Sequence, residues 1–279
     1  MKFKTVGQET AKKLISNAVQ TGPSHSYLFH GPAGVGKKTL SLEFASALLC
    51  ESNEKPCGTC TSCLKFEKKQ HERSVFIEPD GENIKIEQIR ELKKLLKYGV
   101  SEGQYFVICM YQIEKLTPEA ANSFLKILEE PPAGVVFIAV TALKEACLPT
   151  ILSRFLEVPF RHLTSEEVNL LIKNQSYSEV IQKVISFNGS LEGLGQIENE
   201  SLETFFENIT NLKQLPEYAV IDLSKTIFEQ KVYLYWLKSY LAYIQNTSAL
   251  KKLTHFSDSF FKNPLMIENL FFEMVRQPA

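Results

Sequence analysis

The stretch that most constrains the fold is the glycine-rich segment GPAGVGKKT, residues 31–39. It follows a short apolar run of strand type, Tyr27-Leu28-Phe29, and precedes a helical pattern that begins near Leu40. A strand, a glycine loop and a helix in this order are typical of a phosphate-binding loop, because glycine lets successive backbone N–H groups turn toward an anion at the positive end of the helix. We therefore expect an α/β domain around this segment.

The loop contains most of the parts that a bound di- or triphosphate needs. The residues expected to bind it are Gly31, Gly34, Val35, Gly36, Lys37, Lys38 and Thr39. The pattern GxxxxGK[ST] is met up to Lys37, whose ammonium adds a positive charge. The next place, where a hydroxyl would hold Mg²⁺, is occupied by Lys38, and Thr39 comes one residue late. The sequence predicts a phosphate cradle without the usual grip on a metal; the alternative is a loop that only joins a strand to a helix.

Four of the six cysteines lie in one short segment. They are Cys50, Cys57, Cys60 and Cys63, at the spacing C-x6-C-x2-C-x2-C. Short spacers bring four thiolates to one tetrahedral Zn²⁺, and a site filled by four protein ligands is structural. We expect a zinc module at residues 50–63, with four unligated thiols as the alternative. We interpret His71 as a surface or turn histidine and assign Cys109 and Cys147 to the core.

Strand and helix patterns alternate through the first 161 residues. A helical lead-in occupies residues 1–26, and Thr117 with Pro118 has the features of a helix start. Further strands are predicted at 74–78, 105–110, 135–140 and 156–159. This alternation predicts a mainly parallel sheet.

The rest of the chain has helical patterns and no convincing strand. We divide it into a helical region at residues 162–200 and a longer one at 201–279. The second region is rich in aromatic residues: Phe205, Phe206, Tyr233, Tyr235, Trp236, Tyr240, Tyr243, Phe260, Phe261, Phe271 and Phe272. Such stripes usually pack in a core or against another subunit, and only rarely stack on bases.

Composition narrows the classes of partner. A formal net charge of −1 provides no overall field that would draw the protein onto nucleic acid or an anionic membrane. No uncharged apolar run is long enough to span a bilayer, and the opening MKFKTVGQET contains no long apolar segment. We expect a cytoplasmic protein of several domains without a membrane partner.

Several segments together resemble the clamp-loader subunits of bacterial DNA polymerase III, which are AAA+ proteins. The segments are Val6-Gly7-Gln8, HSYLF at 25–29, the glycine loop, the four cysteines, IEQIREL at 86–92, TPEAANSFLKILEEPP at 117–132 and Ser153-Arg154. The long TPEAAN segment is the most specific. The resemblance implies an AAA+ domain at residues 1–161 with an inserted zinc module, a helical lid domain at 162–200 and an all-α collar domain at 201–279 that holds a ring of subunits together.

This family comprises the ATP-hydrolysing tau/gamma subunit and the non-hydrolysing delta-prime subunit. In the hydrolysing members an Asp-Glu pair ends the strand before the TPEAAN helix, and the matching residues in this chain are Tyr111 and Gln112. The lid arginine of the family is matched by Glu192, and Glu114 does not replace the missing pair. Because phosphoryl transfer needs these groups, the resemblance implies a delta-prime-type subunit without ATPase activity. The loop favours bound ATP or ADP, while the lost metal-binding groups favour weak or absent nucleotide binding.

Two further family features are kept. Thr141 matches the sensor position, and Ser153-Arg154 matches the SRC motif, with Phe155 in place of the cysteine. In the family, this arginine reaches the γ-phosphate held by the next subunit. The resemblance therefore implies that Arg154 is an arginine finger acting in trans on a neighbouring ATPase subunit. The alternative is that Arg154 pairs with a carboxylate of its own chain.

The resemblance also implies partners. We expect assembly with the tau/gamma and delta clamp-loader subunits, an indirect action on the sliding clamp, and contact with primed DNA within the assembled complex. One rival interpretation is an ATP-hydrolysing tau/gamma-type subunit, which would need an acidic pair at 111 and 112. The other is a small P-loop kinase or transferase, which would need an acceptor pocket with a base, and the sequence offers no candidate for one.

Overall fold

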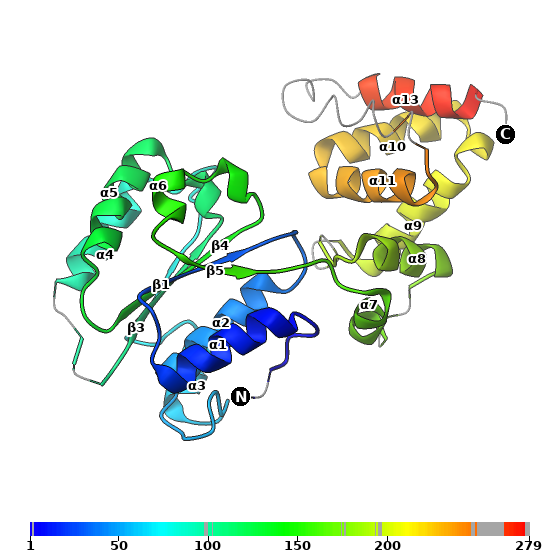
Figure 1. Cartoon of the computed structure of the whole chain (residues 1–279). Coiled ribbons are helices and arrows are strands. Elements are labelled where there is room, and N and C mark those ends of the chain that lie inside the picture. Colours follow the sequence, from blue (N-terminus) through cyan, green and yellow to red (C-terminus); the bar gives the residue numbers. More distant parts are fainter. Residues whose placement is uncertain are drawn as a thin grey trace. The chain divides into compact units, whose positions relative to one another are not determined.

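The computed structural model divides the chain into two compact units, Met1–His162 and Leu163–Ala279. It describes residues 1, 3–97, 100–101, 103–173, 175, 177–192, 194, 197–246, 249 and 265–276. The first unit combines strands and helices, and the described part of the second is helical (Figure 1).

The first unit is built on a five-stranded sheet with the order β2-β3-β4-β1-β5. Its strands are β1 (Ser26–His30), β2 (Ser74–Ile77), β3 (Phe106–Tyr111), β4 (Val135–Thr141) and β5 (Leu156–Pro159). Every neighbouring pair runs parallel. The central strand β4 is buried at each residue, as expected when helices cover both faces of a parallel sheet. The predicted α/β domain with a mainly parallel sheet is confirmed.

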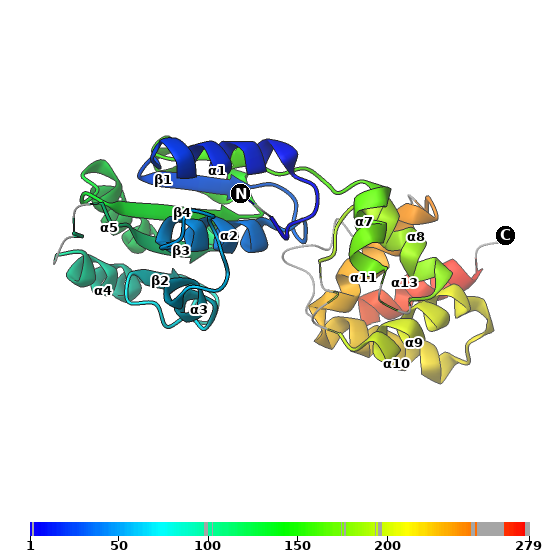
Figure 2. The same cartoon turned by 90° about the horizontal axis from the view of Figure 1, so that it is seen from below.

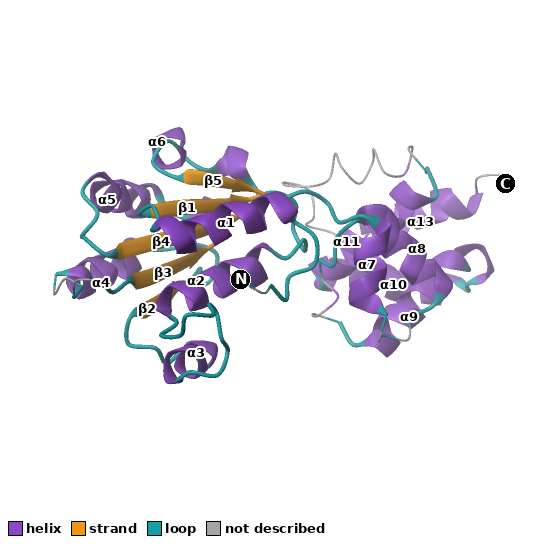
Figure 3. Ribbon diagram, turned by 60° about the horizontal axis from the view of Figure 1, so that its bottom comes forward, coloured by secondary structure: helices purple, strands orange, loops and turns teal. Residues whose placement is uncertain are grey.

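Helices lie on both faces of this sheet, as Figures 2 and 3 show. They are α1 (Glu9–Thr21), α2 (Lys37–Leu49), α3 (Thr61–Glu67), α4 (Ile86–Leu96), α5 (Pro118–Glu129) and α6 (Pro149–Leu152), with the 3-10 turns η1 (Ile113–Lys115) and η2 (Lys144–Ala146). α1 packs against α2, and α4 packs against α5. The helix after the glycine loop begins at Lys37, three residues before the predicted start.

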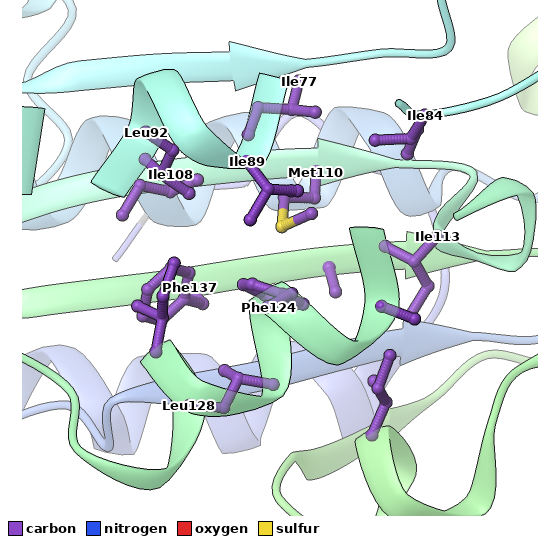
Figure 4. Close-up of a cluster of buried hydrophobic side chains, with 14 of the residues drawn as sticks. Ile77, Ile84, Ile89, Leu92, Ile108, Met110, Ile113, Phe124, Leu128 and Phe137 are labelled. Atoms are coloured by element: carbon purple, nitrogen blue, oxygen red, sulfur yellow. The ribbon is translucent and has the colours of Figure 1, made fainter. Parts of the chain in front are cut away.

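Alternate residues of the strands contribute to two apolar layers, one on each face of the sheet. On one face Tyr27 meets Phe44 of α2, with ring centroids 5.0 Å apart. On the other face Ile108, Phe124 and Phe137 belong to the cluster under α4 and α5 (Figure 4). The rings of Phe124 and Phe137 lie edge to face at 5.4 Å. This packing fixes the positions of the strand ends at which the site lies.

The start of α5 follows the prediction from its sequence. The Thr117 hydroxyl accepts a hydrogen bond from the Ala120 N–H at 3.3 Å, and Pro118 occupies the first turn. Such a cap satisfies an N–H group that has no partner within the helix. α5 therefore begins at a fixed place directly after β3 and η1.

The second unit consists of helices in its described residues. They are α7 (Ser165–Ile172), α8 (Glu179–Asn188), α9 (Asn199–Thr210), the 3-10 turn η4 (Leu212–Gln214), α10 (Glu217–Glu229), α11 (Lys231–Tyr243) and α13 (Leu265–Arg276). Trp236 is fully buried, and its ring centroid lies 6.0 Å from that of Phe206. Phe206 and Trp236 therefore pack within the unit, whereas Phe260 and Phe261 lie outside the described residues. None of the described helices combines the length and apolar composition that crossing a membrane requires.

Replacing Gly31 with alanine is expected to destabilise the first unit. Gly31 has φ of 137°, and an added Cβ would overlap the carbonyl oxygen of Phe160, the residue after β5. At Gly81, φ is 71° but nothing lies within 4 Å of an added Cβ. We expect Gly31→Ala to lower the free energy of unfolding by about 2–4 kcal/mol and the control Gly81→Ala by about 1 kcal/mol, as measured by urea unfolding. Equal losses would show that the approach of Phe160 is unimportant.

Candidate functional site

The glycine loop joins β1 to α2 at the carboxyl edge of the sheet. Gly31, Gly34 and Gly36 all have positive φ, at 137°, 65° and 94°. Gly36 precedes the first helical residue and gives α2 no side-chain cap. The positive end of α2 therefore begins directly at the glycine loop, and helix starts of this kind bind anions. The structure thus has the backbone shape that the sequence predicts for a phosphate-binding loop.

Lys37 holds the loop together from inside. Lys37 is only 7% exposed, and its Nζ donates to the carbonyl oxygen of Gly31 at 2.7 Å and to that of Pro32. Val35, at the turn of the loop, is also buried. A buried ammonium is stable only when it is paired, and these carbonyls provide the pairing. The predicted point charge therefore lies within the cradle.

The place expected to hold a metal contains a different arrangement. Lys38 Nζ lies 2.8 Å from Glu78 Oε1, beyond the end of β2, and 4.4 Å from the ring centroid of Tyr111 at the end of β3. Burial raises the pKa of the Tyr111 hydroxyl, so this group is neutral at pH 7. Gln112 is exposed and carries no charge. Mg²⁺ is bound through carboxylates, and the one carboxylate among these residues, Glu78, is paired with Lys38, so they do not fit the ion.

The remaining predicted loop and sensor residues lie close by. Thr39 is exposed on the first turn of α2, whereas Thr141 is buried at the end of β4. Thr141 is paired with His30 in the parallel register, and His30 directly precedes the glycine loop. The Thr141 hydroxyl accepts a hydrogen bond from the Leu143 N–H at 3.0 Å. The structure thus brings the predicted sensor residue to the strand next to the loop.

Sequence reasoning missed an ionic cluster at this edge. Glu157 of β5 accepts hydrogen bonds from Lys144 Nζ at 2.7 and 2.6 Å and lies 3.2 Å from His30 Nε2. Burial lowers the pKa of His30, so its ring is neutral at pH 7. No spacing signal connects these three residues, because they come from different strands and loops.

Arg154 follows α6, at the surface of the first unit. Its Nη2 lies 2.6 Å from Glu129 Oε1, at the end of α5, and its Nη1 donates to the Thr150 carbonyl oxygen at 2.7 Å. The pairing with an internal carboxylate, considered above as the alternative, is therefore present in this chain. The side chain of Arg154 is 31% exposed, so the pair is open to solvent and is weak.

The position matched to the lid arginine of the family lies in the second unit, after α8. Gly189 ends α8 in the left-handed conformation, and Ser190 and Glu192 follow it. The Glu192 N–H donates to the Ser190 hydroxyl at 3.1 Å.

The four clustered cysteines lie close enough to share one ion. Their sulfur atoms are all within 4.8 Å of one another, with separations of 3.6 Å for Cys50–Cys57, 3.9 Å for Cys50–Cys60 and 4.0 Å for Cys57–Cys63. Zinc bound to four thiolates at about 2.3 Å would separate the sulfurs by about 3.8 Å. The arrangement of this cluster therefore fits a tetrahedral zinc ion.

Each of these sulfurs also accepts a hydrogen bond. The donors are the Ser52 N–H to Cys50, the Cys60 N–H to Cys57, the Cys63 N–H to Cys60 and the Ser46 hydroxyl to Cys63. Backbone N–H groups lower the pKa of the Cys57 thiol to about 6 and also lower that of Cys60, whereas burial raises the pKa of the Cys50 and Cys63 thiols. Hydrogen bonds of this kind stabilise thiolates, which are the metal-binding form of cysteine.

Of the two positions predicted for His71, the surface is wrong and the turn is right, because its carbonyl oxygen accepts from the Ser74 N–H at 3.1 Å at the turn before β2. His71 is only 6% exposed. Its Nε2 lies 2.7 Å from the Ser62 hydroxyl, and its Nδ1 accepts a hydrogen bond from the Arg73 N–H at 3.0 Å. Ser62 in turn donates to the Leu49 carbonyl oxygen at 2.6 Å. Because Ser62 and Leu49 adjoin Cys63 and Cys50, His71 ties the cysteine segment to the end of α2.

Comparison with known proteins identifies the family. A family model described as "DNA polymerase III, delta subunit" matches residues 7–164. The chain belongs to the DNA polymerase III delta subunit family, and the resemblance to clamp-loader subunits found in the sequence is confirmed.

Individual relatives agree with this assignment. The chain is 30% identical to subunit delta' of DNA polymerase III from Bacillus subtilis over 181 residues, which cover 64% of this chain and 55% of that protein. It is 32% identical to subunit gamma from Buchnera aphidicola over 237 residues, which cover 81% of this chain and 64% of that protein. The chain therefore spans less than two thirds of the length of these relatives.

A solved structure shares the fold. The crystal structure of a DNA polymerase III, gamma subunit-related protein from Thermotoga maritima superposes with a TM-score of 0.55, covering 96% of this chain and 98% of that one. The sequence identity is 17%, so this likeness concerns the fold alone.

Removing one cysteine of the cluster is expected to release the metal. We expect the purified chain to contain about one zinc ion and Cys57→Ser to contain much less, because a structural site depends on all four ligands. The midpoint of thermal unfolding should fall by about 4–8 °C, which corresponds to about 2 kcal/mol for a chain of this size. Mass spectrometry of the metal and calorimetry measure the two effects. Cys147→Ser is the control and should keep the metal; a metal-free wild-type chain that unfolds at the same temperature with and without added zinc would contradict the assignment.

Proposed function

We propose that this chain is a non-hydrolysing, delta-prime-type subunit of the bacterial DNA polymerase III clamp loader, which helps load the sliding clamp on primed DNA. The observation that carries the proposal is the contrast within one site. The glycine loop and Lys37 keep the phosphate cradle, while Lys38, Tyr111 and Gln112 replace the groups that would hold and use a metal ion. Since phosphoryl transfer depends on such groups, the chain contributes structure rather than hydrolysis.

The proposed architecture follows the family. The first unit is an AAA+ nucleotide-binding-fold domain with a zinc module at residues 50–63. Residues 162–200 form a helical lid domain, and residues 201–279 form a collar domain through which the subunits of the ring associate. The aromatic residues of α9 and α11 support a well-packed helical domain in the latter region.

Two cofactors belong to the proposal. Cys50, Cys57, Cys60 and Cys63 hold a structural zinc ion, in agreement with their sulfur separations. The loop residues and Thr141 form the site for ATP or ADP, whose binding is weaker than in a subunit that keeps its magnesium ligands. When bound, the nucleotide would add negative charge at the start of α2 and complement Lys37.

Arg154 is proposed as an arginine finger for the ATP site of a neighbouring tau/gamma subunit. Within its own chain, it is paired with Glu129 at 2.6 Å in a solvent-exposed contact. Exposed pairs of this kind contribute roughly 0–1 kcal/mol, which a desolvated γ-phosphate can readily exceed. The finger role therefore requires the guanidinium to leave Glu129 when the ring assembles.

The partners of the proposed subunit are the tau/gamma and delta subunits, the sliding clamp indirectly, and primed DNA within the complex. The second candidate is an ATP-hydrolysing tau/gamma-type subunit. The observation in its favour is that the match to the gamma relative covers 81% of this chain. Tyr111 opposes this candidate, because a buried neutral phenol can neither bind a metal nor act as a base at pH 7.

Arg154→Ala is expected to lower the DNA-stimulated ATPase rate of a clamp loader reconstituted with the tau/gamma and delta subunits. The adjoining site should lose about 10³-fold or more in rate, since a finger acting in trans contributes that much to phosphoryl transfer. The ATPase rate of the whole complex should then fall by the fraction that the adjoining site contributes to it. Phosphate release, with size-exclusion chromatography to show that the complex forms, measures the effect.

Arg90→Ala is the matched control for this experiment. Arg90 is an exposed arginine of α4 that lies near a carboxylate, with Nη1 3.9 Å from Glu87 Oε1, and its replacement should leave the rate unchanged. An unchanged rate for Arg154→Ala in a fully assembled complex would reject the finger role. Failure of the wild-type chain to join the complex would reject the clamp-loader assignment itself.

A further inference from the structure

Two departures from the usual phosphate-binding pattern meet in space. Lys38 follows the loop lysine at the start of α2, and Tyr111 ends β3, far away in the sequence. The Lys38 ammonium nevertheless lies over the Tyr111 ring at 4.4 Å and 2.8 Å from Glu78 Oε1. A cation, an aromatic face and a carboxylate therefore form one cluster beside the glycine loop.

We propose that the Lys38 ammonium takes the place of a divalent metal ion, so that the glycine loop binds the phosphates of a nucleotide without metal. This inference rests on the proposed nucleotide site. It adds the form of the ligand, which is the metal-free di- or triphosphate, and the residues that provide the second positive charge.

The cluster keeps Lys38 near the loop while leaving it accessible. Lys38 is next to Lys37, whose ammonium lies within the cradle, and its side chain is 54% exposed. Glu78 and the Tyr111 face favour one position of a side chain that would otherwise sample many. A phosphate group at the loop can therefore reach two ammonium groups, one buried and one exposed.

The same cluster excludes a divalent cation from this place. Lys38 and Lys37 both repel it, the Tyr111 hydroxyl keeps its proton, and the Glu78 carboxylate is already neutralised by Lys38. Mg²⁺ also gives up its water ligands reluctantly and would find no free carboxylate among these residues. Nucleotide complexed with Mg²⁺ carries less negative charge than free nucleotide, and the two lysines therefore favour the free form.

Glu78 is predicted to oppose nucleotide binding. Its carboxylate is paired with the Lys38 ammonium at 2.8 Å, so a phosphate would compete with it for this ammonium. Replacing it with glutamine removes a negative charge and frees the ammonium. Glu78 and Lys38 thus have opposite expected effects on affinity, which a role in folding alone would not produce.

Calorimetric titration of the full chain with ADP tests the proposal. The buffer is freed of divalent ions by a resin before the protein is added, because a soluble chelator would also take zinc from the four cysteines. We expect ADP to bind at least as tightly without Mg²⁺ as with it. Lys38→Ala should weaken metal-free binding about tenfold, close to the loss of one charged hydrogen bond, and Glu78→Gln should strengthen it about threefold.

Lys183→Ala is the matched control. Lys183 is 53% exposed, is paired with Glu179, and belongs to the second unit, so its replacement removes the same charge and should leave the affinity unchanged. Unchanged thermal unfolding of Lys38→Ala would show that the fold is intact.

Three results would overturn the proposal. They are a tenfold or greater loss of ADP affinity when Mg²⁺ is removed, equal metal-free affinities of the wild-type chain and Lys38→Ala, and no binding of ADP in either buffer. The last result would leave the clamp-loader assignment standing, because assembly with the other subunits is measured separately.

Discussion

The buried ammonium of Lys37 is the interaction on which the site depends. By donating to the carbonyl oxygens of Gly31 and Pro32, it closes the glycine loop on itself between β1 and the first turn of α2. The parallel sheet brings the other residues of the site next to the loop, because the carboxyl ends of its strands share one edge. Tyr111, Thr141 and the loop reach that edge from three strands that are separated in the sequence. A phosphate site can therefore be kept in shape while its surrounding chemistry changes.

The changes around the loop are physically coupled. A lysine in the place of a hydroxyl group would repel a metal ion that the site still needed, and a tyrosine in the place of a carboxylate would leave such a metal without a ligand. Together, Lys38 and Tyr111 form a favourable cation–π contact that Glu78 completes. In the proposed site, a cation that is covalently part of the chain takes the place of a mobile one. The cysteine module lies after the other end of α2, and its hydrogen-bonded sulfurs fit a role in stabilising that segment.

The sequence predicted the elements of the first unit because their signals are local. The glycine loop, the Thr117 cap and the apolar strand runs each depend on neighbouring residues, and the structure has the corresponding elements with shifts of a few residues at their ends. The partners of Lys38 and Arg154 could not be predicted from spacing, because Glu78 and Glu129 come from other elements. The exposure of His71 was predicted wrongly, because its burial depends on how the cysteine segment folds around Ser62. Glu129 ends the helix of the TPEAAN segment, whereas Arg154 follows α6. Their contact therefore depends on how these elements pack, which the sequence spacing does not reveal.

The central claim is that this chain keeps a phosphate cradle and has lost the means to use it for hydrolysis. The most direct measurement is the release of inorganic phosphate by the purified chain alone, with saturating ATP, Mg²⁺ and primed DNA. We expect a rate indistinguishable from that of ATP in buffer, since Lys38, Tyr111 and Gln112 provide neither a metal ligand nor a base. Turnover at the rate of an ordinary P-loop ATPase, abolished by Lys37→Ala, would contradict it.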